Sequence, residues 1–301
     1  MVRCNSQILQ RFANALFSLL VLGGFACLMS ATSVMAQSAV SDWVYARHGQ
    51  VRLVSAQAEP DRNGELQLGL QFRLYKGWKT YWRTPGENGI APVFDWSAST
   101  NFKTASVKWP LPQRFKDGDG HSIGYSREVI LPIDVTVDDR GTETNVTLAL
   151  AYAVCRDICV PAQANFRLDF PLQSEPSALN RAARDIARFE AKVPQPHEEA
   201  SMQVTALTLH EQDDGQILAV SLESKGALNG AQALIEIDGP YRVGEGVPRV
   251  DEPPDHARLY FPLDSDDDAP TLLGQRLTVI AWDASGRIIE GTLPVTAGST
   301  E

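Results

Sequence analysis

Cysteine is scarce in this chain, with four among 301 residues. So few thiols exclude the disulfide-dense frameworks that hold small secreted domains together. Two of the four, Cys4 and Cys27, lie within the first 36 residues. The other two, Cys155 and Cys159, have three residues between them. An isolated, closely spaced pair indicates a thiol/disulfide switch if the chain works in an oxidising compartment.

Basic clusters are also lacking, and so are long apolar runs beyond the N-terminus. The formal net charge is −10, from 27 basic and 37 acidic side chains. An acidic chain without a basic patch is a poor candidate for binding nucleic acid or an anionic lipid surface. No apolar run long enough to span a bilayer follows Met29. We therefore expect no nucleic-acid partner and no membrane insertion of the mature chain.

The N-terminus has the features of a cleavable signal peptide over residues 1–36. Arg3 and Arg11 form a short basic start, residues 12–29 are apolar, and small or compact residues precede a cleavage site after Ala36. A retained membrane anchor is the alternative, but a pair of glycines interrupts the apolar run. We expect export to the periplasm, where the surroundings permit disulfides.

The strand pattern predicts an all-β protein with two sandwich domains. Over residues 37–172, alternating or β-branched segments are separated by turn clusters, and they lie at 66–74, 128–137, 144–154 and 163–170. The pattern resumes over residues 201–301, with segments at 203–209, 216–222, 233–237, 277–282 and 288–293. Many short strands with polar connections are typical of antiparallel sandwiches.

Residues 173–200 are predicted to join the two domains. Leu179, Ile186 and Phe189 recur at helical intervals, and Pro176 stands where a first helical turn accepts proline. Two further prolines, at 194 and 196, end the pattern. We expect one short amphipathic helix followed by a stiff linker.

Three interpretations of Cys155 and Cys159 remain open from the residues alone. A structural disulfide closing so short a loop contributes only about 2 kcal/mol, which makes it a weak staple. A metal site needs further ligands, for which His121 is the best candidate, although Cu(I) tolerates few soft ligands. We favour an exchangeable redox pair. A thioredoxin-like site is excluded, because that site is a Cys-x-x-Cys at a helix start.

Three segments, in this order, resemble the amino-terminal domain of the DsbD family of protein-disulfide reductases, including its two-sandwich ScsB version linked to copper tolerance. The resemblance covers residues 43–170. The segments are Lys76-Gly-Trp-Lys-Thr-Tyr-Trp-Arg-Thr-Pro-Gly-Glu-Asn-Gly89, Pro112-Gln-Arg-Phe-Lys-Asp-Gly-Asp-Gly-His-Ser-Ile-Gly-Tyr-Ser-Arg-Glu-Val-Ile-Leu-Pro132 and Tyr152-Ala-Val-Cys-Arg-Asp-Ile-Cys-Val-Pro-Ala162.

The resemblance implies an immunoglobulin-like domain whose catalytic pair is Cys155 and Cys159. In that family the pair passes reducing equivalents from a membrane electron-transfer protein to periplasmic thioredoxin-like or disulfide-isomerase proteins, with no cofactor or metal. The family's membrane domain and terminal thioredoxin-like domain are not found in this sequence, so a separate polypeptide is expected to donate the electrons. The alternative is a non-catalytic envelope adaptor with a static disulfide or a Cu(I)-binding pair.

The resemblance also implies a set of supporting residues. These are Trp78, Tyr81, Asp119, His121, Ile123 and Tyr125. Trp78 and Tyr81 match aromatic positions near the family's active site, with core packing as the alternative. A cap loop matches residues 117–125. The familiar aromatic cap residue is not evident, and three glycines predict a more mobile loop in which Ile123 and Tyr125 are candidates to shield the pair. The sequence does not tell which cysteine attacks.

Overall fold

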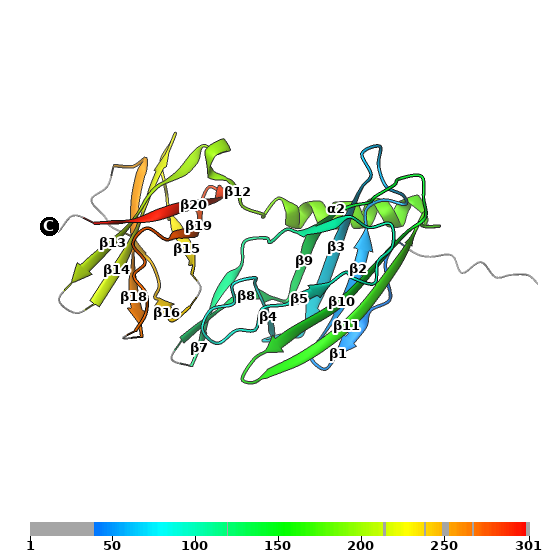
Figure 1. Ribbon diagram of the computed structural model, residues 1–301, viewed down its shortest axis with the longest axis horizontal. Coiled ribbons are helices and arrows are strands. Elements are labelled where there is room, and N and C mark those ends of the chain that lie inside the picture. Colours follow the sequence, from blue (N-terminus) through cyan, green and yellow to red (C-terminus); the bar gives the residue numbers. More distant parts are fainter. Residues whose placement is uncertain are drawn as a thin grey trace, which may run out of the picture. The chain divides into compact units, whose positions relative to one another are not determined.

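The computed structural model describes residues 39–118, 120–212, 215–237, 239–248, 253–266 and 268–298. The predicted signal peptide and Asp119 lie outside these ranges. Within them the regular structure is mostly β-strand, which confirms the predicted all-β class (Figure 1). No helix among the described residues is long and apolar enough to cross a membrane.

The first domain consists of two antiparallel sheets. The five-stranded sheet has the order β1-β2-β3-β9-β6, and the six-stranded sheet has the order β11-β10-β4-β8-β7 with β5 paired to β10. The strands are β1 (Val44–Ala46), β2 (Gly49–Ser55), β3 (Glu65–Leu74), β4 (Lys79–Tyr81), β5 (Val93–Asp95), β6 (Thr104–Val107), β7 (Gln113–Asp117), β8 (Gly120–Ser126), β9 (Glu128–Thr136), β10 (Thr144–Cys155) and β11 (Cys159–Phe170).

The core of this domain follows from the alternation along its long strands. On β10, every second side chain from Val146 to Val154 is buried among the apolar residues of β3 and β9. The side chains of Ala153 and Cys155 have the opposite parity and join Tyr81 in a separate small cluster. Because successive strand residues point to opposite faces, Ala153, Cys155 and Tyr81 lie on the outer face of the six-stranded sheet.

Helix α2 (Pro176–Glu190) packs on the five-stranded sheet rather than only joining two domains. Its three buried side chains, Ala182, Ile186 and Phe189, belong to the core of the first domain. Gly69 on β3 lies under this helix. A Cβ at Gly69 would stand 2.8 Å from Ile186 Cγ1, so the helix needs a glycine at this position to pack so closely. The predicted helix is confirmed. The structure shows in addition that its buried side chains form part of the core of the first domain.

Replacing Ile186 by valine is expected to lower the free energy of unfolding by about 0.5–1.5 kcal/mol, because one buried methylene is lost. The side chain is 0% exposed. Urea unfolding followed by far-UV circular dichroism measures the change. Ala187, on the exposed side of the same helical turn, gives the control: Ala187→Ser should stay within about 0.5 kcal/mol of the wild type. Equal effects of the two substitutions would contradict the packing described.

The second domain is a sandwich whose two layers share strand β20. Its strands follow the order β15-β19-β20-β13-β14-β18-β16, and β20 pairs antiparallel with β19 but parallel with β13. The core lies between the layers. The elements are β12 (Gln195–Pro196), a 3₁₀ turn (His197–Glu199), β13 (Met202–Gln212), β14 (Gly215–Ser224), β15 (Gln232–Glu236), β16 (Tyr241–Val243), β17 (Val247–Pro248), β18 (His256–Ser265), β19 (Arg276–Trp282) and β20 (Ile288–Ala297).

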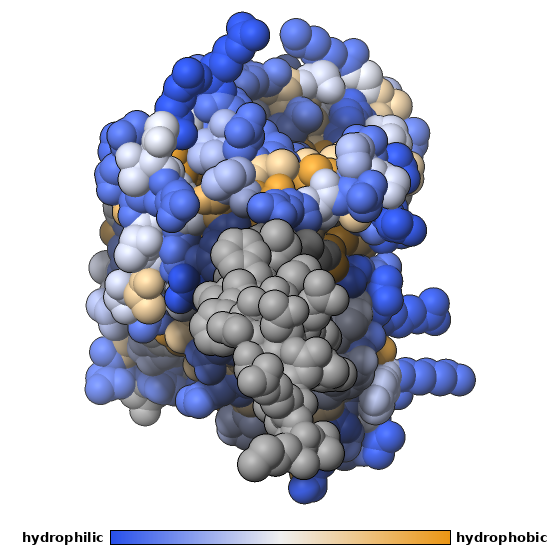
Figure 2. Space-filling model, turned by 90° about the vertical axis from the view of Figure 1, so that its right-hand side faces the viewer, coloured by the Kyte–Doolittle hydropathy of each residue, from blue (hydrophilic) through white to orange (hydrophobic). Residues whose placement is uncertain are grey.

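The surface of the first domain is mostly polar where Figure 2 displays it. Hydrophilic residues dominate that view, and apolar residues stand between them singly or in small groups. Scattered apolar side chains of this kind are normal on soluble proteins and mark no docking site by themselves. The described part of this face therefore gives no indication of a partner.

Candidate redox-active site

Cys155 and Cys159 are joined by a disulfide at the end of the β10–β11 hairpin. They are the last cross-strand pair of that hairpin, with Cα atoms 4.2 Å apart, and residues 156–158 form the turn between them. Their surroundings differ. Cys155 is 1% exposed, whereas Cys159 is an exposed residue, as are the three residues of the turn. An incoming thiolate is therefore expected to approach the bond from the side of Cys159.

Tyr81 brings a hydrogen-bond donor to both sulfurs. Its hydroxyl oxygen lies 2.7 Å from Cys155 Sγ and 3.0 Å from Cys159 Sγ. Strand β4 pairs with the end of β10, with Lys79 opposite Cys155, and this pairing sets the position of Tyr81. Burial, and then the charge of Asp117, raise the pKa of Tyr81 to about 12. The phenol consequently stays protonated at physiological pH and can donate one hydrogen bond.

Two neighbouring segments enclose the Tyr81 hydroxyl. The carbonyl of Asn88 lies 3.3 Å from it, and the Asn88 side-chain amide donates to the Asp117 carbonyl at 3.0 Å. The Asp117 carboxylate, at the end of β7, also forms an ion pair with Lys79, with Nζ and Oδ2 2.6 Å apart. The Lys79 side chain is only 8% exposed. The loop through Asn88 and the β7–β8 hairpin are thus both attached beside the disulfide.

The predicted cap loop is a β-hairpin rather than a mobile loop. Residues 120–126 form β8, which pairs with β7 on one side and β4 on the other. Gly124 stands opposite Tyr81, and a Cβ there would lie 2.0 Å from the Thr80 carbonyl oxygen. This glycine therefore permits close strand approach. The sequence indicated only conformational freedom at this position, because the pairing of β8 with β4 could not be seen in it.

The structure gives each of the other predicted residues its own surroundings in the first domain. Trp78 is 8% exposed, stacks on His48 with ring centroids 3.5 Å apart, and has the Arg156 guanidinium 5.6 Å from its ring. Ile123 and Tyr125 belong to the domain core, where the Tyr125 hydroxyl donates to the Pro110 carbonyl at 2.7 Å. Their side chains pack inward, whereas Tyr81 and Cys155 face outward. His121 is half-buried opposite Lys116.

Lys79 and Asn88 were not among the predicted residues. Both lie in the first segment that carries the family resemblance, but nothing in their spacing indicates a contact with a site more than sixty residues away. In the described ranges, no three His, Cys, Asp or Glu side chains are grouped so that they could hold a metal ion. The chemistry available here is that of one exposed cysteine, one buried cysteine and a neutral donor.

Known proteins resemble this chain in the domain that carries the disulfide. Residues 50–171 match the family model of the N-terminal domain of the thiol:disulfide interchange protein DsbD. The N-terminal periplasmic domain of ScsB from Proteus mirabilis superposes with a TM-score of 0.70 at 24% identity, covering 87% of this chain and all of that one (100%). The human desmocollin-1 ectodomain gives a TM-score of 0.21 at 8% identity over 80% of this chain and 46% of that chain, too low to indicate a shared fold.

No curated protein matches the chain. The ScsB likeness extends over both sandwiches and the helix between them and concerns the fold, whereas the family match is confined to the domain that carries the disulfide. Over residues 50–171, this chain is similar to the N-terminal domain of the thiol:disulfide interchange protein DsbD.

Proposed function

We propose that this chain is a periplasmic thiol:disulfide interchange protein that relays electrons through Cys155 and Cys159. The observation that carries the proposal is the asymmetry of the bond. An exposed residue, Cys159, is joined to a buried one, Cys155, whose sulfur has a protonated tyrosine hydroxyl 2.7 Å away. A static staple needs neither the exposed cysteine nor the donor.

Reduction of the disulfide then takes two steps. A thiolate of the electron donor attacks Cys159 Sγ, the Cys155–Cys159 bond breaks, and Cys155 leaves as a thiolate. A second donor thiolate then attacks the donor's own sulfur in the mixed disulfide and releases Cys159. Two electrons enter the pair, and the donor leaves as a disulfide. We infer that Tyr81 stabilises the Cys155 thiolate by donating a hydrogen bond from its hydroxyl group, which makes Cys155 a better leaving group.

Delivery of the electrons reverses these steps on another protein. The Cys159 thiolate attacks the partner's disulfide, and one partner cysteine leaves as a thiolate. The Cys155 thiolate then attacks Cys159 Sγ, which breaks the mixed disulfide, restores the intramolecular bond and releases the partner's other cysteine as a thiolate. The proposed donor is a membrane electron-transfer protein. The proposed acceptors are thioredoxin-like or disulfide-isomerase proteins, which the match of residues 50–171 to the DsbD N-terminal domain supports.

The reduction potential of the pair tests this function. Equilibrium with reduced and oxidised glutathione, quenched by alkylation and analysed by mass, should give a potential higher than about −300 mV, as exchangeable disulfides have. The chain from Gln37 onward with Cys155 and Cys159 both replaced by serine, which contains no other cysteine, should take up no label. A value well below about −300 mV would favour the alternative function, a non-catalytic envelope module with a static disulfide.

A further inference from the structure

The second sandwich, in which no cysteine lies, is attached to the strand that carries Tyr81. Arg83, two residues after Tyr81, makes two ion pairs with that domain. Its Nε lies 2.7 Å from Glu236 Oε1 on β15, and its Nη2 lies 2.6 Å from Glu290 Oε2 on β20. All three side chains are partly buried, with 29%, 19% and 34% of their surfaces exposed. We call these three residues the Arg83 clamp.

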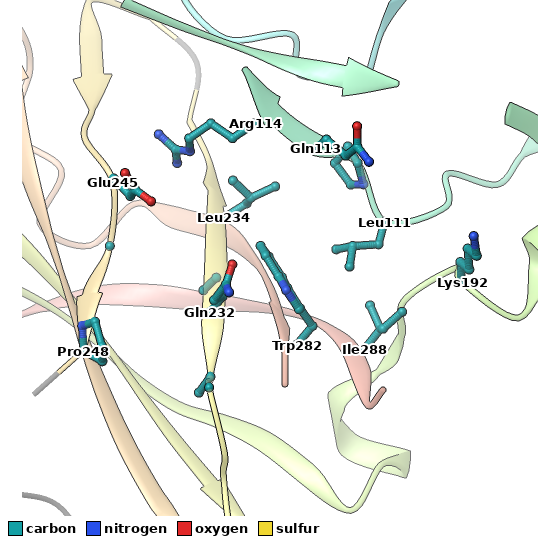
Figure 3. A pocket seen from close by; sticks show the side chains of 15 residues that line it. Leu111, Gln113, Arg114, Lys192, Gln232, Leu234, Glu245, Pro248, Trp282 and Ile288 are labelled. Carbon is teal, nitrogen blue, oxygen red and sulfur yellow. The ribbon is translucent and has the colours of Figure 1, made fainter. Parts of the chain in front are cut away.

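Apolar packing holds the same two domains together next to the clamp. Leu234 and Ile280 of the second domain are buried in the core cluster of the first, and Trp282 and Ile288 pack against it. Beyond this contact lies an open cleft of about 890 Å³, where Trp282 and Ile288 face Leu111 (Figure 3). The apolar contact can hold the domains together by burial, so the paired charges of the clamp call for a further explanation.

The clamp lies at the start of the segment that encloses the redox site. Trp82, between Tyr81 and Arg83, donates its backbone N–H to the Ile123 carbonyl at 3.0 Å, and the Pro85 carbonyl accepts from the Ile123 N–H at 2.8 Å. The chain then turns back so that the Asn88 carbonyl reaches the Tyr81 hydroxyl. Strand β4 itself is only three residues long. Fixing residue 83 therefore restricts both the end of β4 and the loop over Tyr81.

We propose that the Arg83 clamp is a positioning device, through which the second sandwich holds the Tyr81 hydroxyl against the two sulfurs. Arg83 is a positioning residue because it touches neither sulfur. Its guanidinium lies 4.9 Å from the Trp82 ring, so the group stays in contact with the β4 segment while it binds the carboxylates. A planar two-donor fork suits this geometry, since each carboxylate takes one nitrogen of the same rigid group.

The proposal rests on the proposed function only in assigning the disulfide a redox role, and its test needs no partner protein. The double variant Glu236→Gln/Glu290→Gln removes both charges of the second domain with little change in shape. We expect it to slow reduction of the Cys155–Cys159 bond by dithiothreitol roughly threefold, the low end of coupling between residues in one network. Arg83→Lys, which lacks the fork, should show a smaller loss of the same kind.

Two comparisons separate positioning from mere stability. In a Tyr81→Phe background the clamp variants should have no further effect, because the hydroxyl they position is gone. Lys108 bridges Asp134 and Glu190 in the first domain at 2.8 and 2.6 Å, so Asp134→Asn/Glu190→Gln gives a matched loss of two carboxylates elsewhere and should leave the rate unchanged. Thermal unfolding of each variant confirms that it is folded.

The clamp proposal would be overturned if Glu236→Gln/Glu290→Gln left the rate of reduction by dithiothreitol unchanged. It would also be overturned if this double variant slowed reduction equally in the wild-type and Tyr81→Phe backgrounds. These outcomes are distinct from a failure of the proposed function. If dithiothreitol reduces the pair with the expected dependence on the clamp, but the pair exchanges with no thioredoxin-like protein, the clamp proposal stands and the relay function is rejected. A pair that dithiothreitol does not open in the folded protein would overturn both.

Discussion

Cys155→Ala protein is expected to accumulate a covalent complex with a thioredoxin-like partner, whereas Cys159→Ala protein is expected to accumulate none. The reason is access. Cys159 lies in the exposed turn of the hairpin, and Cys155 is 1% exposed beneath it. A mixed disulfide must form at the sulfur that a partner can reach, and it persists only when the resolving cysteine is missing.

The experiment uses the chain from Gln37 onward, which contains no other cysteine. A thioredoxin-like protein whose own resolving cysteine is replaced, and whose remaining cysteine carries 2-nitro-5-thiobenzoate in a mixed disulfide, serves as the partner; attack by Cys159 forms the complex and releases the thionitrobenzoate. Complexes are separated on non-reducing gels. The Cys155→Ala/Cys159→Ala variant is the control and should give no band. The opposite pattern, with complexes formed only through Cys155, would contradict the assignment of Cys159 as the interchange cysteine.

A small reagent measures the same asymmetry without a partner. With each single-cysteine variant, the rate of reaction with 5,5′-dithiobis(2-nitrobenzoate) should be at least roughly tenfold higher for Cys159 than for Cys155, because reactivity follows exposure. Denaturing both variants should bring their rates together. If the two rates already agree in the folded proteins, the buried position of Cys155 does not control its chemistry.

The sequence predicted those parts of the fold that repeat along one strand or one helix. The alternation over residues 144–154 is long enough to identify β10, and the spacing of Ile186 and Phe189 identifies α2. It also placed the cysteine pair at a strand connection, where the structure has it. In each case the signal lies within a single element, because side-chain periodicity is a local property.

The rest of the site depends on pairing between distant segments, which leaves no local signal. Strand β4 has three residues, too few to show a period, yet it sets Lys79 opposite Cys155 and brings Tyr81 to the sulfurs. The glycines of the β7–β8 hairpin indicated mobility when read one at a time. Gly124 instead serves a contact with Thr80 that appears only when the two strands are paired.

Replacing Tyr81 by phenylalanine is expected to raise the apparent thiol pKa of the reduced pair by about one unit or more. The hydroxyl is the donor that the described structure brings to Cys155 Sγ, and a hydrogen bond to a charged group contributes roughly 1.5–3 kcal/mol, against about 1.4 kcal/mol for one pKa unit. Losing it destabilises the thiolate, so the rate of alkylation by iodoacetamide should shift to higher pH. At a pH at which the wild-type thiolate is populated, the same loss disfavours the reduced pair, and its equilibrium with glutathione should move towards the disulfide by up to about tenfold.

Tyr125→Phe is the matched control for this substitution. Tyr125 is also a buried tyrosine of the first domain, but its hydroxyl donates to the Pro110 carbonyl and not to a sulfur. The substitution removes the same atom from the same domain, so it should cost stability without moving the thiol pKa. Identical pH profiles for Tyr81→Phe and the wild type would mean that the 2.7 Å contact with Cys155 Sγ does not act on the thiolate. A shift of equal size in Tyr125→Phe would assign the effect to general loosening of the domain, because only Tyr81 has its hydroxyl on the reacting atoms.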